Sequence, residues 1–109
     1  PVIMREHVSN ISALIPDGTL TEVLVSDVKN GRAGRIDFLA VDGDKFSIID
    51  LKTNREMKPE KLRVYAKQLS FYADILIQYG LELNELKLIH FDGNETKEIT
   101  LDYETTLEN

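Results

Sequence analysis

Residues 34–54, GRIDFLAVDGDKFSIIDLKTN, combine two apolar, β-branched runs with a tight turn. This pattern predicts two antiparallel strands, at 35–41 and 45–52. Both strands have apolar residues on both faces, so we expect both faces of their sheet to be covered. Burial of a charge is costly unless it is paired, which makes the charged residues in these runs candidates for a function. Asp37 and Asp50 interrupt the apolar runs, and Lys52 follows Asp50 closely.

The geometry of the turn determines whether these charged side chains meet. Side chains alternate along a strand, so Asp50 and Lys52 share a face. A two-residue loop at 43–44 (Gly-Asp) suits a type II′ turn and places Asp37 directly opposite Asp50. A loop at 42–43 (Asp-Gly) suits type I′ and places Asp37 one diagonal step away. Both registers bring the three charged groups to one face, whereas an odd number of loop residues would not.

Two adjacent carboxylates are compatible with two different structures. They raise each other's pKa unless a cation lies between them, and Mg²⁺ or Mn²⁺ commonly binds one or two carboxylates together with waters and substrate phosphate. The alternative is a structural ion-pair network in which Lys52 neutralises Asp37 and Asp50. The short pattern D-x-K is common to both interpretations.

The distribution of charge bears on nucleic-acid binding. The chain has 109 residues and a net charge of −6, which taken alone argues against such binding. The segment 52–67, however, contains six basic and only two acidic side chains. It forms either a solvated helix face or a phosphate-binding surface, and its position beside Lys52 favours the second interpretation. The candidate DNA contacts are Arg55, Lys58, Lys61 and Arg63.

Length and composition predict a single domain, residues 1–109, of ordinary globular composition. The absence of cysteine excludes disulfides and thiolate metal sites and fits a reducing compartment, so we expect a cytoplasmic protein. No apolar run reaches membrane-spanning length, and no signal-peptide pattern opens the chain. Because the first residue is Pro1 rather than Met, we expect the chain to be a fragment of a longer protein.

The remaining pattern predicts the element order α-β-β-β-α-β-β. The other expected elements are a helix at 2–15, a strand at 19–27, a loop at 29–34, a helix from Pro59 to a cap at Gly80, and strands at 86–91 and 97–103. The second helix is long enough for a right-handed crossover between parallel strands. We therefore expect an α/β (α+β) fold with a mixed central sheet between helices.

Three short motifs follow one another within residues 20–80: G-x-x-D at 34–37, D-x-K-T at 50–53, and Q-x-x-x-Y formed by Gln68 and Tyr72. Together they resemble the PD-(D/E)XK nuclease superfamily, and more narrowly its RecB/AddA-type nuclease domains. The order α-β-β-β-α-β is also the restriction-endonuclease-like core of that superfamily, here with one extra C-terminal strand. Ile36 stands where the name of the superfamily has proline.

The resemblance implies a metal-dependent phosphodiesterase, an exonuclease-type module of DNA repair, recombination or phage metabolism, which leaves 5′-phosphate and 3′-hydroxyl ends. Mg²⁺, with Mn²⁺ as a substitute, would be held by the two aspartates and the carbonyl of Leu51. Lys52 would position the attacking water, and Gln68 and Tyr72 would face the site or the DNA beside it. The implied partners are DNA and a helicase or another domain of a larger nuclease complex.

A further side-chain ligand is expected from the first helix or the first strand. Glu22 ranks first, because its segment resembles the E-x-x-V that begins the first strand in relatives, where the glutamate is usually near the site. His7 ranks second: it lies beside the apolar stripe of the first helix, where a histidine is more often packed than ligating. Glu6 points further from that stripe.

Two other functions compete with catalysis. A non-catalytic DNA- or protein-binding module could use the same fold, although degenerate members of the superfamily usually lose an aspartate or the lysine, and this chain keeps all three. A structural domain unrelated to nucleic acid is supported only by the acidic net charge.

Overall fold

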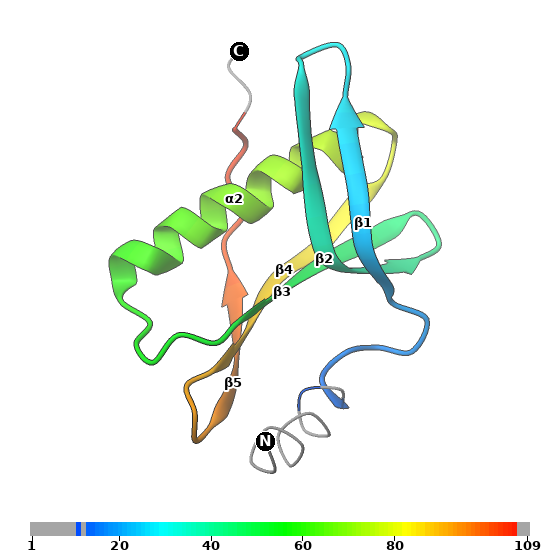
Figure 1. Cartoon of the computed structure of the whole chain (residues 1–109). Coiled ribbons are helices and arrows are strands. Elements are labelled where there is room, and N and C mark those ends of the chain that lie inside the picture. The colour runs from blue at the N-terminus through cyan, green and yellow to red at the C-terminus, as the bar shows by residue number, and fades with distance from the viewer. Residues whose placement is uncertain (1–10, 12, 107–109) are drawn as a thin grey trace.

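The computed structural model describes residue 11 and residues 13–106 of the chain. Figure 1 shows the elements in their order along the chain: β1 (Leu20–Asp27), β2 (Arg32–Asp42), β3 (Lys45–Lys52), α2 (Pro59–Gln78), β4 (Glu82–Phe91) and β5 (Thr96–Leu101). The helix expected at 2–15 falls outside the described residues except for its end, where Ile11 and Ala13 are helical. Among the described residues, no helix is long and apolar enough to cross a membrane.

The strands form one five-stranded sheet in which the spatial order β1-β2-β3-β4-β5 follows the chain. β3 and β4 are parallel, and the other neighbouring pairs are antiparallel. α2 provides the crossover that a parallel connection requires. The predicted mixed α+β fold is therefore confirmed, including the extra C-terminal strand.

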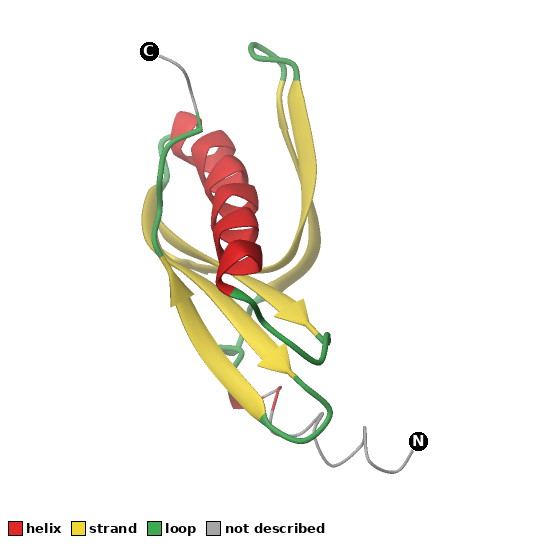
Figure 2. Cartoon of the chain, turned by 90° about the vertical axis from the view of Figure 1, so that its left-hand side faces the viewer, coloured by secondary structure: helices red, strands yellow, loops and turns green. Residues whose placement is uncertain are grey.

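α2 covers one face of the sheet, and Figure 2 shows the strongly twisted sheet curving around it. Pro59 occupies the first turn, where the missing N–H is harmless. The apolar stripe of α2 includes Leu69 and Ala73, which pack in the main core with Ile48 of β3 and Leu86 of β4. Complete burial of a leucine or isoleucine side chain contributes about 1.5–3 kcal/mol, so this interface fixes α2 on the sheet.

A second, smaller core lies on the opposite face of the sheet. Ile11, from the end of the N-terminal segment, packs there against Ile49, Ile89 and Phe91. The expectation that both faces of the central strands are covered is therefore met within the described part of the chain.

The β2–β3 hairpin has the first of the two predicted registers. Asp42 pairs with Lys45, which leaves the two-residue loop 43–44, and Gly43 has the positive φ of 65° that a type II′ turn requires. Continued along the ladder beyond the pair of Phe38 with Ile49, this register places Asp37 opposite Asp50.

The loop predicted at 29–34 is wrong in its second half, because β2 already begins at Arg32. Arg32 pairs with Asp27 of β1, its guanidinium carbon lies 4.7 Å from the ring centre of Phe71, and its Nη1 donates to Thr106 at 2.9 Å. The contacts with Phe71 and Thr106 are long-range, so they could not be predicted from the local turn-forming residues.

The β1–β2 ladder is irregular at Asp37. Thr21 pairs with Phe38 and Val23 with Ile36, so Glu22 lies opposite Asp37, but Glu22 has a left-handed φ of 52°. The alternation of β2 also changes phase here, since residues 36 and 39 both belong to the main core and Phe38 packs on the other face. The irregularity therefore lies beside the first aspartate of the candidate site.

The segment after β5 is held against α2 by Asp74, which is buried. The Tyr103 hydroxyl donates to Asp74 Oδ1, and the backbone N–H and hydroxyl of Thr106 donate to Oδ2 at 2.5 and 2.7 Å. Burial by itself would raise the pKa of Asp74, but the hydrogen bonds from Thr106, Tyr103 and Thr105 outweigh it and lower the pKa.

Candidate functional site

The structure brings Asp37, Asp50 and Lys52 together at the end of the β2–β3 hairpin away from its turn. The carboxyl groups of Asp37 and Asp50 are within hydrogen-bonding reach of each other. Lys52 Nζ lies 2.9 Å from Asp50 Oδ2. This convergence follows from the hairpin register, as the sequence predicted.

The surroundings of Asp50 disfavour the ionised form of its carboxyl group. Asp50 is only 9% exposed, and burial together with the hydrogen bond and charge of Asp37 raises its pKa to about 6, against the lowering effect of Lys52. For Lys52, burial favours the neutral form, but the hydrogen bond and charge of Asp50 outweigh it and raise the lysine pKa. A buried carboxyl group with a raised pKa beside a second carboxylate is typical of a cation-binding or catalytic site.

The donor set fits a hard divalent cation. Asp50 Oδ2 is buried and, apart from its ion pair with Lys52, has no hydrogen-bond partner in the described chain. Two adjacent carboxylates with an unsatisfied buried oxygen match the one or two protein carboxylates that Mg²⁺ uses alongside waters and substrate phosphate. A cation there would relieve the repulsion that raises the pKa of Asp50.

A shallow hollow of about 400 Å³ adjoins Asp37 on the side of β1, and Glu22, Leu51 and Phe38 also line it. Glu22 is exposed, and among the described residues no group of three or more carboxylate, histidine or cysteine side chains is close enough to hold a metal ion. Glu22 as a further ligand therefore stays a prediction, as does the Leu51 carbonyl. His7 and Glu6 lie outside the described residues.

Two residues that the sequence did not single out contact the site or its following loop. The ring centre of Tyr65, in the second turn of α2, lies 4.5 Å from Lys52 Nζ. His90, which pairs with Lys52 across the parallel ladder, is buried and donates from Nε2 to the carbonyl oxygen of Asn54 at 2.6 Å. Neither is predictable from a local motif, because both contacts depend on how α2 and β4 dock on β3.

Gln68 and Tyr72 lie one turn apart on α2, and Gln68 Nε2 donates to the Tyr72 hydroxyl at 3.3 Å. The Tyr72 ring packs on Gly34: a Cβ built there would lie 2.9 Å from Tyr72 Cδ1 and nearer still to Cε1. The glycine of the first motif is thus required by the tyrosine of the third. In the described chain no hydrogen bond or ion pair links Gln68 or Tyr72 to the two aspartates or Lys52, so their role at the site stays a prediction.

The predicted DNA-binding residues Arg55, Lys58, Lys61 and Arg63 are all exposed, on the loop after β3 and the first turns of α2. None of them forms an ion pair with another described residue. Their charges are therefore available to phosphate groups. These four residues follow Lys52 along the chain, on the loop after β3 and the first turns of α2.

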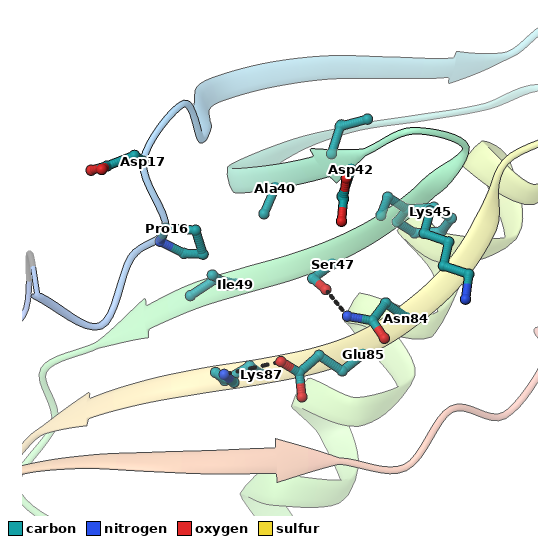
Figure 3. A pocket seen from close by; sticks show the side chains of 12 residues that line it. Pro16, Asp17, Ala40, Asp42, Lys45, Ser47, Ile49, Asn84, Glu85 and Lys87 are labelled. Carbon is teal, nitrogen blue, oxygen red and sulfur yellow. Dashed lines mark hydrogen bonds and ion pairs between the residues drawn. The ribbon is translucent and has the colours of Figure 1, made fainter.

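A different hollow, of about 650 Å³, lies near the hairpin turn and is shown in Figure 3. Four of its polar side chains are paired with one another: Ser47 Oγ accepts from Asn84 Nδ2 at 3.2 Å, and Lys87 Nζ lies 3.0 Å from Glu85 Oε1. Neither aspartate of the candidate site lines it. It therefore has no reactive group comparable with the Asp37–Asp50–Lys52 cluster.

Comparison with known proteins gives a match at the level of the family and of the fold. The family model described as PD-(D/E)XK nuclease superfamily matches residues 12–98. The search of curated proteins found no match. Among solved structures, the one described as "Crystal structure of SSO0001" is similar with a TM-score of 0.57 and 22% sequence identity, over 91% of this chain and 50% of that chain. The chain thus spans half the length of that protein, and at this identity the likeness shows the fold alone.

Proposed function

The chain belongs to the PD-(D/E)XK nuclease superfamily, and we propose that it hydrolyses DNA phosphodiester bonds with a divalent cation held by Asp37 and Asp50. The observation that carries this proposal is the buried carboxyl group of Asp50 beside that of Asp37, with Lys52 Nζ 2.9 Å from Asp50 Oδ2. Without a metal, this pair of carboxylates would lower the stability of the fold, because burial and Asp37 both oppose the ionisation of Asp50.

Each residue has a distinct role in the proposed reaction. The carboxylates of Asp37 and Asp50 and the carbonyl of Leu51 would hold Mg²⁺, for which Mn²⁺ could substitute, and Glu22 or His7 would complete the set. The bound cation would supply Lewis acidity to the phosphate and to a water molecule. Lys52 orients the attacking water and offsets the negative charge that develops on the phosphate. The products carry 5′-phosphate and 3′-hydroxyl ends.

The finer assignment rests on the motifs. Thr53 after the lysine, and Gln68 with Tyr72 on α2, resemble the RecB/AddA-type domains, so we place the chain with exonuclease-type modules of DNA repair, recombination or phage metabolism. Such modules act beside a helicase or another domain of a larger complex. The absence of cysteine suits the reducing cytoplasm.

The DNA path is proposed along the exposed basic residues that follow Lys52. Arg55, Lys58, Lys61 and Arg63 would contact backbone phosphates, and exposed Gln68 would approach the strand next to the site. Phosphate contacts of this kind supply affinity without sequence specificity.

The test is degradation of labelled single- and double-stranded DNA with Mg²⁺, with Mn²⁺ and with EDTA. We expect metal-dependent cleavage that falls at least about 10²-fold in Asp50→Asn and strongly in Lys52→Ala, because each removes several kcal/mol of transition-state stabilisation. Asp44→Asn is the matched control: it removes an exposed carboxylate from the turn of the same hairpin and should leave the rate unchanged.

Mn²⁺ binding followed by calorimetry gives a readout that does not depend on cleavage. We expect binding to the wild type and to Asp44→Asn, and its loss in Asp50→Asn. DNA binding and Mn²⁺ binding without any cleavage would indicate the non-catalytic module. Cleavage that persists in EDTA or in folded Asp50→Asn would contradict the proposed mechanism.

A further inference from the structure

Lys52 has an aromatic neighbour in addition to its two carboxylate neighbours. Asp50 and Asp37 approach it from the β2–β3 hairpin, whereas Tyr65 approaches from α2, with the centre of its ring 4.5 Å from Nζ. This distance lies well within the roughly 6 Å over which the face of an aromatic ring attracts a cation. The ammonium of Lys52 is therefore held between a carboxylate on the sheet and a ring on the helix.

A cation bound at the site would weaken the contact between Lys52 and the carboxylates. Asp50 and Asp37 would then share their charge with the metal, and the positive charge of the metal would repel the ammonium of Lys52. The face of the Tyr65 ring is not a metal ligand, so its attraction for the ammonium remains. A lysine side chain has many rotamers, and fixing it without such a contact loses rotamer entropy.

We propose that Tyr65 is a positioning residue that holds the Lys52 ammonium through its ring face when Asp50 and Asp37 bind the metal. The contact itself stands on the geometry of β3 and α2. Its consequence for the reaction rests on the proposed function, in which Lys52 orients the attacking water.

Tyr65 also packs against the main core and is half-buried. The test must therefore separate the effect of lost packing from the effect of losing the contact between the ring and the Lys52 ammonium. Tyr65→Phe keeps the ring face and removes only the hydroxyl. Tyr65→Leu keeps an apolar side chain in the core and removes the ring. Phe71→Leu is the matched control, because Phe71 is another half-buried aromatic residue of α2 that contacts Arg32 and Tyr72.

The first test is the proton NMR spectrum of the Lys52 ε-methylene group, with and without Mg²⁺. A ring at this distance shifts the resonance upfield. We expect the shift in the wild type, in Tyr65→Phe and in Phe71→Leu, both before and after Mg²⁺ is added, and its loss in Tyr65→Leu. A wild-type resonance that returns to the position of a free lysine when Mg²⁺ is added would overturn the proposal, whether or not the protein cleaves DNA.

The second test is the steady-state cleavage rate of the same variants. We expect kcat to fall about three- to thirtyfold in Tyr65→Leu with KM unchanged, and to stay within about threefold of wild type in Tyr65→Phe and Phe71→Leu. Equal kcat values in Tyr65→Leu and Phe71→Leu, in an active wild type, would overturn the positioning role while leaving the proposed nuclease function intact. An inactive wild type would contradict the proposed function, and the NMR comparison would still decide whether Tyr65 holds Lys52.

Discussion

The carboxyl group of Asp50 is stabilised in its protonated form by the fold. Its pKa is raised from 3.8 to about 6, first by burial and then by Asp37. Between these two values the folded chain binds more protons than the unfolded chain, so the free energy of unfolding falls as the pH rises through this range. Above about pH 6, the metal-free protein carries the full penalty of an ionised Asp50.

We therefore predict that Asp50→Asn stabilises the metal-free protein at pH 7.5. A shift of roughly two pKa units corresponds to at most about 3 kcal/mol, and the loss of the ion pair with Lys52 reduces the expected gain to about 1–2 kcal/mol. Urea unfolding in EDTA measures this, and the gain should disappear near pH 4. Asp44→Asn should show no such pH-dependent gain; a variant less stable than wild type at both pH values would contradict the prediction.

The contact between Gly34 and the Tyr72 ring requires glycine at position 34. Because Tyr72 lies where a Cβ would be, Gly34→Ala should displace the ring and destabilise the protein by about 1–3 kcal/mol. The free energy of unfolding measures the effect.

A double-mutant cycle with Tyr72→Leu separates the clash of the new methyl group with the Tyr72 ring from the intrinsic effect of alanine in a strand. The two substitutions should be non-additive, with the alanine costing less once the ring is gone. Additive effects would mean that Gly34 is needed for some other reason.

Among the elements, the β2–β3 hairpin was predictable except for the choice between two registers, both of which bring the charged side chains to one face. The sequence around Gly43 specifies a two-residue turn, and the side-chain period of two then determines which residues meet. The convergence of Asp37, Asp50 and Lys52 therefore followed from local information. The ends of α2 were predictable for a similar reason, since Pro59 and Gly80 mark them.

Other features of the site were not predictable, because they arise between elements. The positions of Tyr65 and His90 beside β3 depend on the docking of α2 and on the parallel register of β4, which no turn specifies. The irregularity at Glu22 was also missed: the sequence there has no glycine to indicate a left-handed φ. Residues near the amino terminus lie outside the described chain, so the prediction for His7 stays untested.

The first turns of α2 allow a test of the proposed DNA path. Replacing Lys58, Lys61 and Arg63 together by Ala should weaken DNA binding and reduce the slope of log K against log salt by up to about three units, roughly one for each lost phosphate contact. Fluorescence anisotropy at several salt concentrations measures the slope.

A control variant with the same loss of charge is Lys29→Ala, Lys45→Ala and Lys97→Ala combined, since all three lysines are exposed and lie outside α2. This control should keep most of the wild-type slope. An unchanged slope in the α2 variant would place the DNA elsewhere on the surface.

On the scale of the whole molecule, Asp74 connects α2 with the segment that follows β5. Because its pKa is lowered by the hydrogen bonds it accepts, its contribution to stability is present above its unfolded pKa, near 3.8, and is lost as the pH falls through the lower folded value. The ionised form of Asp74 is thus the form that holds Tyr103 and Thr106.

We predict that Asp74→Asn lowers the free energy of unfolding by about 1–3 kcal/mol at pH 7, because the amide accepts fewer and weaker hydrogen bonds than the carboxylate. The difference from wild type should shrink between pH 5 and pH 2.5. Urea titrations across this range provide the measurement, with Asp102→Asn, an exposed carboxylate in the same segment, as the control. A difference that stays constant with pH would mean that the charge of Asp74 is not responsible.

The strands lie in the sheet in the same order in which the ribosome synthesises them. β1, β2 and β3 can pair in succession through short loops, whereas β4 must close a loop of almost forty residues before Asp50 reaches its neighbour Leu88. Long-range closure of this kind is the slow part of folding. During synthesis, the two aspartates are therefore brought together early and in water, and their burial and the arrival of Tyr65 come last. A nascent chain would acquire its reactive centre only after the helix and the fourth strand have left the exit tunnel.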